Sequence, residues 1–346
     1  MKKLLGTLAI VLVAATCLFW SCSTSKQTLH IYTFADFFNL DLLEQFEKKY
    51  NCRIAIDTFD SNESMYAKLR LGGGGYDLIT PTNNFLEVLN SQGMLQKIDH
   101  ARIPNAINLD ENVFHLLDKS TLDYGLPYVF AFSGIAWRTD KISCDNPSYA
   151  IFGDEQYRGR MVLLNDLREA LGAALRYKGY SVNTTDPKEL EEAKMQLIAW
   201  KNNIAKFENE QYKNGIANGE YLVVQGYNGD ILQVIGENEH VAFAMPKEGT
   251  GISIDFFVIP KEAKHVDLAY EFINYFYDPV ISAKNMNFTC FLSPNRAAYA
   301  LVDDFLKSQI APFLDEQTLK KSELVKDLGS NMELYYKAWE EVKTAT

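Results

Sequence analysis

Residues 29–85 decide the fold, and they read LHIYTFADFFNLDLLEQFEKKYNCRIAIDTFDSNESMYAKLRLGGGGYDLITPTNNF. Short runs rich in β-branched and aromatic residues alternate here with two amphipathic stretches, which predicts strand, helix, strand, helix, strand. Because such a unit forms a right-handed parallel sheet, its first and last strands end at the same edge. Those ends carry residues 34–38 (FADFF) and 80–84 (TPTNN). Ligands of open α/β sheets bind outside this edge, so the stretch predicts a ligand mouth with aromatic rings, one carboxylate and short polar side chains.

The composition favours a globular protein, and its acidic balance is compatible with a cationic ligand. The chain has 346 residues and 47% apolar content, which suits two globular lobes better than one core or a disordered chain. Its formal net charge is −11, and loss of Lys2 and Lys3 with an N-terminal leader would make it −13 (−11 − 2). This acidic balance argues against a nucleic-acid partner, because phosphate binding requires clusters of Lys and Arg.

The first 21 residues have the pattern of a lipoprotein signal peptide. Lys2 and Lys3 precede an almost wholly apolar run, which stops at Ser21 and Cys22 before a polar segment. Cys22 has the position of the lipidated cysteine of bacterial lipoproteins, although the two residues before Ser21 are bulkier than usual. We therefore predict a lipid anchor at Cys22. The alternative is an ordinary cleaved signal followed by a coincidental cysteine.

The segments after residue 120 predict a second set of elements. The apolar run 124–137 is broken only by Gly134 and is long enough for a strand that crosses between two lobes. Asp186-Pro187 has the pattern of a helix start, and Trp200 lies on the apolar stripe of that helix, which predicts a core position. No linker rich in Pro and Ser is present, as expected if strands join the lobes.

One carboxylate stands inside an apolar strand pattern. Asp255 lies within residues 252–260, ISIDFFVIP. A lone buried carboxylate costs several kcal/mol unless it is paired or hydrogen-bonded. Either this strand lies at an edge with Asp255 on its solvated face, or the acid is buried at a functional site, and the segment alone leaves both open.

Three further acids have simple structural interpretations. Asp166 and Glu169 stand three residues apart at a helix start, which is the spacing of a capping box. Asp36 precedes the first helix and could also serve as its cap. Aromatic residues at predicted strand ends and in loops are more often part of a core than of a ligand site; here they are Phe34, Phe37, Tyr227 and Phe291.

No catalytic or metal-binding motif is recognisable. Gly72–Gly75 leads into a strand and lacks the lysine of a phosphate loop, so a flexible turn is predicted. Cys52, Cys144 and Cys290 are too far apart to suggest a disulfide framework or a metal cluster. The histidines outside the first strand are scattered without ligand spacing, at positions 100, 115, 240 and 265. Neither an enzyme nor a cofactor is therefore expected.

Seven segments, in order along the chain, resemble the spermidine/putrescine-binding proteins of bacterial polyamine ABC importers. They are Leu43–Phe46 (LEQF), Asp60–Glu63 with Met65–Leu69 (DSNE and MYAKL), Tyr76–Leu78 (YDL), Gly93–Asp99 (GMLQKID), Asn183–Glu189 (NTTDPKE), Met245–Gly249 (MPKEG) and Ser293–Asn295 (SPN). The resemblance covers nearly the whole mature chain.

The resemblance implies a fold and a function. The fold is α/β, a two-lobed periplasmic-binding-protein fold of type II-like architecture with a hinged ligand cleft between the lobes. The expected parts are a signal peptide over 1–21, a linker over 22–27, lobe 1 over 28–132 and 253–300, and lobe 2 over 133–252 and 301–346. The implied function is a non-enzymatic receptor, anchored on the periplasmic side of the cell envelope, that delivers polyamine to the permease subunits of an ABC importer. A lipoprotein that senses a polyamine or another cationic ligand for a membrane partner is the alternative.

The resemblance also implies ligand contacts. The family's four acidic contacts fall on Asp36, Asp166, Glu169 and Asp255. Its aromatic contacts fall on Phe34, Phe37, Tyr227 and Phe291, and its hydroxyl contact falls on Thr82. Three positions depart from the family: Asn84 replaces a tyrosine, Ser253 a tryptophan and Val325 a glutamine. The four acids that would attract a cation are kept, while the side chains that would surround the ligand's methylenes differ in part. This leaves the choice between spermidine and putrescine open.

Overall fold

The computed structural model describes residues 26–111, 117, 119–310 and 320–345. The predicted signal peptide, Cys22 and all but the last two residues of the predicted linker lie outside these ranges. Within them, no helix is both long enough and apolar enough to span a membrane.

The described residues contain ten strands that pair in the order β2–β1–β3–β9–β4–β7–β5–β6, with β8 beside β4 and β10 beside β9. The strands are β1 (Thr28–Thr33), β2 (Arg53–Thr58), β3 (Leu78–Ile79), β4 (Gly125–Arg138), β5 (Met161–Leu163), β6 (Lys206–Phe207), β7 (Val223–Tyr227), β8 (Val241–Ala244), β9 (Gly251–Val258) and β10 (Glu323–Leu324). β1 is parallel to both β2 and β3, as predicted for the first 85 residues.

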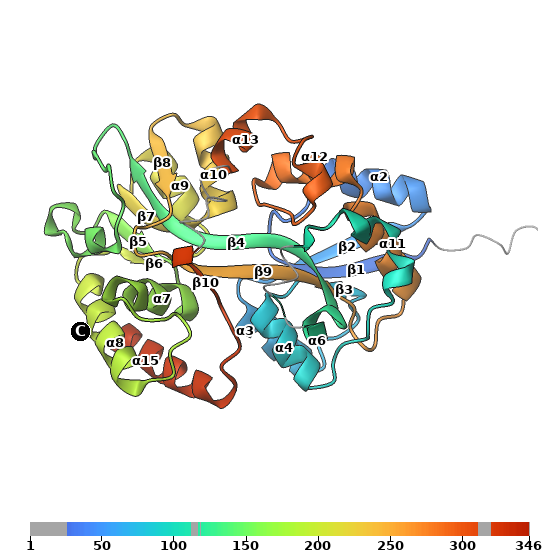
Figure 1. Cartoon of the computed structure of the whole chain (residues 1–346), viewed down its shortest axis with the longest axis horizontal. Helices are drawn as coiled ribbons and strands as arrows, with labels where there is room; N and C mark the ends of the chain where they lie inside the picture. Colours follow the sequence, from blue (N-terminus) through green and yellow to red (C-terminus); the bar gives the residue numbers. More distant parts are fainter. Residues whose placement is uncertain (1–25, 112–116, 118, 311–319, 346) are drawn as a thin grey trace, which may run out of the picture.

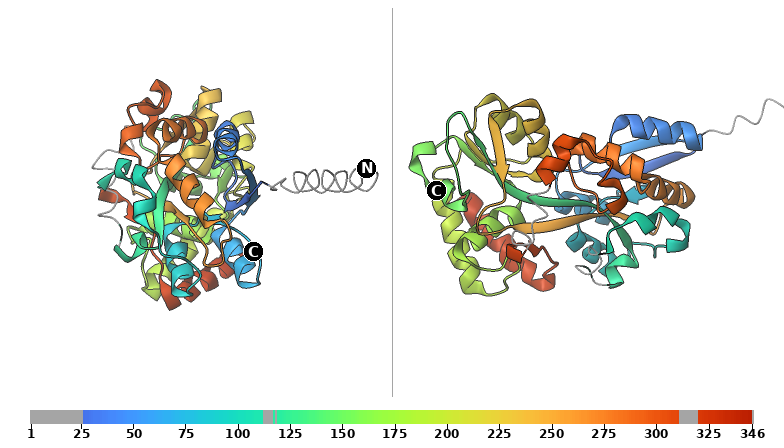
Figure 2. Two further views of the ribbon diagram at one scale, coloured as in Figure 1. Left: turned by 90° about the vertical axis from the view of Figure 1, so that its right-hand side faces the viewer. Right: turned by 45° about the horizontal axis from the view of Figure 1, so that its top comes forward.

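Strands β4 and β9 are common to both halves of the molecule. They pair in antiparallel fashion from Gly125 opposite Val258 to Phe132 opposite Ile252. Beyond that point β4 continues without β9 and pairs with β7 and β8 instead. Figure 1 shows the two strands running across the centre, and the right view of Figure 2 shows them side by side between the halves. The predicted crossing strand is therefore confirmed.

The first half is a three-layer α/β/α arrangement around β1–β3 and the adjoining ends of β4 and β9. Its helices are α2 (Leu40–Tyr50), α3 (Asn62–Arg70), α4 (Asn83–Ser91), α6 (Lys119–Leu122) and α11 (Val266–Phe276). Helices α2 and α11 cover one face, where the rings of Phe46 and Phe272 lie 5.2 Å apart. Helices α3 and α4 cover the other face through Met65 and Leu86. A sheet covered on both faces explains why its inner strands β3 and β9 are mostly buried, whereas the edge strand β2 has no buried residue.

The second half repeats this arrangement around β5–β7. Its helices are α7 (Leu167–Lys178), α8 (Pro187–Lys201) and α15 (Met332–Thr344) on one face, and α9 (Tyr212–Asn218) and α10 (Asn228–Glu237) on the other. Trp200 is 1% exposed among these helices, so its predicted core position is confirmed. Asp186 caps α8 and Pro187 takes its first turn, also as predicted.

Helices α12 (Pro279–Thr289) and α13 (Asp304–Ile310) pack a further apolar cluster against Phe132 of β4 and Leu232 of α10. Figure 1 shows them above the two central strands. Short 3-10 turns complete the described elements: η1 (His100–Arg102), η2 (Pro104–Asn108), η3 (Tyr149–Gly153), η4 (Glu155–Tyr157), η5 (Arg296–Ala298) and η7 (Gly329–Asn331).

The prediction for the turn at Gly72–Gly75 is confirmed, whereas the prediction for the cap of α2 is not. Gly72–Gly75 forms a turn, and the positive φ angles of Gly72 (83°) and Gly75 (99°) explain the need for glycine. The interpretation of Asp36 as the cap of the first helix is wrong. The cap of α2 is Asn39, whose Oδ1 accepts the N–H of Asp41 at 2.9 Å. Asp36 has left-handed backbone geometry (φ 57°) and points elsewhere.

Asp77 fastens the start of β3 to two other segments, and its loss should destabilise the first half. Its buried carboxylate accepts the backbone N–H of His30 at 3.0 Å and those of Lys264 and His265 at 2.8 Å each. Burial raises the pKa of Asp77, but these hydrogen bonds outweigh it, so the pKa is lowered overall. We expect Asp77→Ala to reduce the free energy of unfolding by about 3 kcal/mol in urea titrations, since three partly buried backbone N–H groups lose their acceptor.

The pH dependence of this effect has a defined sign. A lowered pKa means that the Asp77 contribution is present above the unfolded value of about 3.9 and is lost as pH falls through the folded value. Asp267→Asn, at the exposed start of α11, is the matched control and should change the free energy of unfolding by less than about 1 kcal/mol. Equal losses in the two variants would contradict the assignment.

Candidate ligand-binding site

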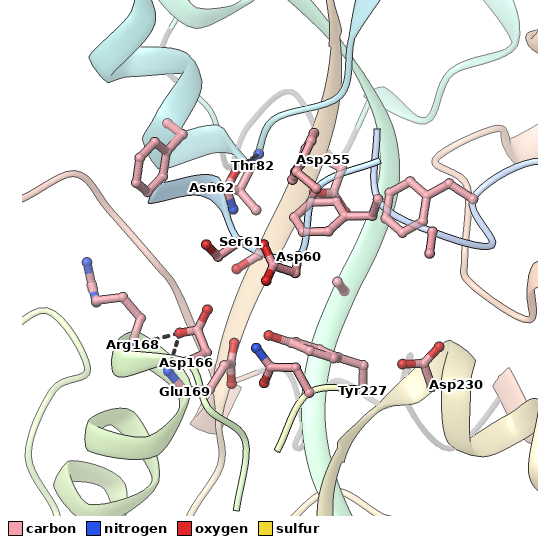
Figure 3. Close-up of a pocket in the computed structure, with 18 of the residues that line it drawn as sticks. Asp60, Ser61, Asn62, Thr82, Asp166, Arg168, Glu169, Tyr227, Asp230 and Asp255 are labelled. Atoms are coloured by element: carbon pink, nitrogen blue, oxygen red, sulfur yellow. Dashed lines mark hydrogen bonds between the residues drawn. The ribbon is translucent and has the colours of Figure 1, made fainter. Parts of the chain in front are cut away.

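A cavity of about 330 Å³ lies between the two halves. Its walls come from the loop after β1, the starts of α3 and α4, strand β9, the start of α7, and helices α9 and α10. This volume lies within the range of small-molecule sites. Figure 3 shows side chains from both halves pointing into the same space.

All of the candidate contacts implied by the sequence line this cavity. They are Phe34, Asp36, Phe37, Thr82, Asn84, Asp166, Glu169, Tyr227, Ser253, Asp255 and Phe291, and Val325 lies with them. Their convergence follows from the strand order, because β9 inserts between β3 and β4. Contact of these side chains with a ligand stays a prediction.

Asp255 is a buried acid of a central strand. β9 pairs with β3 on one side and β4 on the other, and the side chain is 2% exposed, so the alternative of a solvated edge strand is wrong. No described residue hydrogen-bonds its Oδ1 atom. Burial raises the pKa of Asp255 well above its ordinary value. The strand therefore holds a carboxylate without a satisfied partner at the cavity wall.

Asp166 and Glu169 both cap a helix and line the cavity. Asp166 Oδ1 accepts the N–H groups of Arg168 (2.8 Å) and Glu169 (3.0 Å) at the start of α7, as the capping interpretation predicted. The Glu169 carboxylate does not complete the box; it accepts the Ser133 hydroxyl at 2.5 Å. Burial, and then the negative charge of Asp166, raise the pKa of Glu169 to about 8. Burial also raises the pKa of Asp166.

Glu63 is a cavity acid that the sequence analysis did not identify. It lies in the first turn of α3, in the first half of the molecule, and faces the start of α7 in the second half. Burial, and then the charge of Asp166, raise the pKa of Glu63 to about 7. Ser61 caps α3, and nothing in the pattern of residues 60–63 points toward another carboxylate across a cleft.

Two basic side chains also line the cavity, and sequence reasoning missed both. The Arg168 guanidinium donates to the backbone oxygen of Lys326 at 2.8 Å and to Asn183 Oδ1 at 2.9 Å, and burial lowers its pKa. Lys213 lies 3.3 Å from a carboxylate oxygen of both Asp36 and Asp230. Against these two bases the lining has eight acids: Asp36, Asp60, Glu63, Asp166, Glu169, Glu210, Asp230 and Asp255.

Aromatic rings form the apolar wall. Phe37 has its ring centroid 5.3 Å from that of Phe34 and 5.6 Å from that of Phe291, and the three rings also pack against the core of the first half. The two interpretations of these residues, core and ligand wall, are therefore compatible. Gly229 makes room for Phe291, because a Cβ atom at that position would lie 2.3 Å from the ring.

The chemistry of the lining suits an organic cation. Carboxylates attract ammonium groups, and aromatic faces attract both ammonium groups and methylenes. In the described part of the chain, no group of three or more His, Cys, Asp and Glu side chains is arranged to hold a metal ion.

Two α/β halves joined by paired strands, with a ligand cavity between them, define a two-lobed binding protein of the periplasmic type. The chain belongs to the family described as bacterial extracellular solute-binding protein, which it matches over residues 41–312. The predicted fold class and family resemblance are confirmed.

Relatives and solved structures agree with this assignment. The chain is similar to the putrescine/cadaverine-binding protein of Pseudomonas aeruginosa, with 32% identity over 362 residues and 99% of each chain covered. It is 30% identical to the spermidine/putrescine-binding periplasmic protein of Escherichia coli, covering 98% of this chain and 96% of that one. The structure of a spermidine/putrescine ABC transporter protein from Listeria monocytogenes is similar to this chain, with a TM-score of 0.86 and 28% identity. The match covers 93% of this chain and 100% of that one. A lipoprotein structure from Treponema pallidum has a TM-score of 0.82 at 30% identity, covering 91% and 99%.

Proposed function

We propose that this protein is a polyamine-binding receptor of a bacterial ABC importer. The observation that carries the proposal is the excess of acids over bases in the cavity lining, eight against two. Glu169 and Asp255 are buried and Asp166 is half-buried. Among the described residues, the charge of Arg168 offsets only part of the rise in the pKa of Asp166 and Glu169, and burial is the one cause of the raised pKa of Asp255. The names of the relatives, which include putrescine, cadaverine and spermidine among their ligands, agree with this chemistry.

The energetics favour a polycation over a neutral ligand. Two opposite charges at ~4 Å attract by about 4 kcal/mol at an effective dielectric near 20. An ammonium group or methylene chain over an aromatic ring adds about 0.5–2 kcal/mol. Ammonium groups at the acids and methylenes along Phe34 and Phe37 would use both parts of the lining. The empty cavity is unfavourable for the same reason, since its carboxylates repel one another.

We propose that ligand binding closes the two lobes. The division into 28–132 with 253–300 and 133–252 with 301–346 crosses β4 and β9 next to Phe132 and Ile252, which pair with each other. These paired strands, and the third connection between residues 300 and 301, would need to bend for the lobes to move. A ligand that contacts acids of both lobes binds the closed state more tightly than the open state. This difference in affinity shifts the protein toward the closed state.

The proposed setting is the periplasmic side of the cell envelope. There the receptor is held by a lipid on Cys22 and passes its ligand to permease subunits, without performing chemistry itself. The family assignment to extracellular solute-binding proteins supports this setting.

A ligand panel tests the proposal directly. We expect putrescine, spermidine or cadaverine to raise the melting temperature of the purified mature protein, whereas arginine, glutamate and glucose should not. A ligand at ~100-fold above its Kd stabilises by about 2.7 kcal/mol, which is easily detected in a thermal-shift assay. Calorimetry then gives the Kd of each ligand. The proposal is wrong if no polyamine binds more tightly than about 100 μM, a free energy of roughly 5.5 kcal/mol.

A further inference from the structure

We propose that Lys213 is a resident ammonium group, which fills the cation position beside Asp36 and makes the receptor select diamines over longer polyamines. This inference rests on the proposed function and names the ligand class within it. It gives Asp36, one of the four acids implied to bind ligand, a partner from the protein itself.

Lys213 is built into the cavity wall. It lies on α9, its side chain is 23% exposed, and its Nζ atom is 3.3 Å from Asp36 Oδ2 and 3.3 Å from Asp230 Oδ1. Asp230 is held in place by the hydroxyl of Tyr212, which donates to its other oxygen at 2.5 Å. Burial lowers the pKa of Lys213, but the two carboxylates outweigh this effect and raise it overall, so the ammonium stays charged.

The other inward acids are buried or half-buried, and they leave two cation positions open. Nearby Arg168 fills neither position, because its guanidinium donates to the backbone oxygen of Lys326 and to Asn183 Oδ1. One is at Asp255 on β9, and the other is at Asp166 and Glu169 with Glu63 facing them. Figure 3 shows Asp255 on one side of the cavity and the Asp166–Glu169 pair on the other, with Asp230 lying beyond Tyr227. The other two acids of the lining, Asp60 and Glu210, are exposed to solvent, and the side chain of Asp36 beside Lys213 is 62% exposed.

Charge matching therefore favours a ligand with two ammonium groups. A diamine can place one ammonium at each open position, with its methylenes between them along the rings. A third ammonium directed toward Asp36 would meet Lys213, which carries the same charge and already pairs with that carboxylate. The departures at Asn84 and Ser253 change the wall around the ligand, whereas Lys213 changes the number of charges the site accepts.

The pair could instead act only as a latch, because Asp36 belongs to the first half of the molecule and Lys213 to the second. Loss of a latch weakens closure on every ligand by the same factor. Loss of a resident cation changes the ratio of affinities for ligands of different charge. The ratio of Kd values is therefore the quantity that separates the two roles.

The test measures Kd values for putrescine and spermidine by calorimetry at pH 7.5 and low salt. We expect the wild type to prefer putrescine, and Lys213→Met, which keeps the length of the side chain, to shift the Kd ratio at least about tenfold toward spermidine. Lys213→Arg should keep the wild-type ratio because it keeps the charge. Lys48→Met removes an exposed lysine paired with Glu44 on α2 and should also leave the ratio unchanged.

The outcomes distinguish this inference from the proposed function. A wild type that binds no polyamine overturns both. A wild type that binds polyamines but prefers spermidine overturns this inference alone, whether or not the variant folds. If Lys213→Met weakens the affinity for both ligands by the same factor, the pair is a latch, and the inference is again overturned. Lys213→Gln provides a second neutral variant, and circular dichroism checks that each variant is folded.

Discussion

Asp255→Asn should remove tight polyamine binding while making the empty protein more stable. Asp255 is 2% exposed, and its Oδ1 atom has no hydrogen-bond partner among the described residues. Burial raises the pKa of this carboxyl well above its ordinary value, so ionising it in the empty protein costs free energy that a neutral amide of the same shape avoids. In the complex the same carboxylate is proposed to pair with an ammonium group. Removal of one partner of a buried pair costs about 3–5 kcal/mol, which is roughly a 100-fold to 4,000-fold loss of affinity.

Two measurements on one variant check this prediction. Calorimetry should show the loss of affinity for putrescine and spermidine, and thermal unfolding without ligand should show a raised melting temperature. Asp304→Asn, at the fully exposed start of α13, removes the same formal charge and should leave both quantities unchanged. If Asp255→Asn binds polyamines as the wild type does, Asp255 does not bind an ammonium. If the empty variant is less stable, the carboxylate has a structural role that the cavity does not explain.

The case of Asp255 also shows where sequence reasoning stops. Its apolar neighbours predicted a strand, but burial of the side chain depends on which strands lie beside β9. Those partners are β3, from early in the chain, and β4, from its middle. Strand periodicity contains no information on that order, so the solvated and buried alternatives could not be separated. The resemblance to polyamine-binding proteins resolved the question only because it carried the order of a known fold.

Local patterns were informative where local geometry decides the structure. The cap at Asp166, the start of α8 at Asp186 and the turn at Gly72–Gly75 depend on residues a few positions apart. Glu63 and Lys213 depend on packing between distant elements. A lysine on a short helix and a glutamate in a first turn are ordinary surface residues until the two halves face each other.

Binding should release protons, and affinity should therefore rise with pH. In the empty protein, burial and the charge of Asp166 raise the pKa of Glu169 to about 8 and that of Glu63 to about 7. Both groups are then largely protonated at pH 6. An ammonium beside them favours the ionised form, so binding displaces protons into solution. The ligand itself stays charged, because primary ammonium groups titrate near about pH 10.

We expect the Kd for putrescine to fall at least about tenfold between pH 6 and pH 8.5, the change that linkage gives when one group titrates over one pH unit or more. Calorimetry at pH 7 in phosphate and in Tris, whose ionisation enthalpies differ, should give a release of about one proton per ligand. Glu169→Gln should lose part of this release and bind more weakly at pH 8.5. Glu210→Gln, at an exposed lining residue, is the matched control and should keep the release.

The stability of the empty protein should move in the opposite direction. A carboxyl group whose folded pKa is raised contributes stability that is fully present below its unfolded pKa of about 4.3 and is lost as pH rises through the folded value. For Glu169 that loss extends to about pH 8. The ionisation of Glu169 should therefore make the free energy of unfolding of the empty protein smaller at pH 8 than at pH 6. Saturating polyamine should remove the difference, because the ligand supplies the positive charge that the ionised cavity lacks.

A pH-independent affinity with no buffer-dependent heat would contradict the raised pKa values, whereas an affinity that falls with pH would contradict the assignment of these acids to the ammonium site.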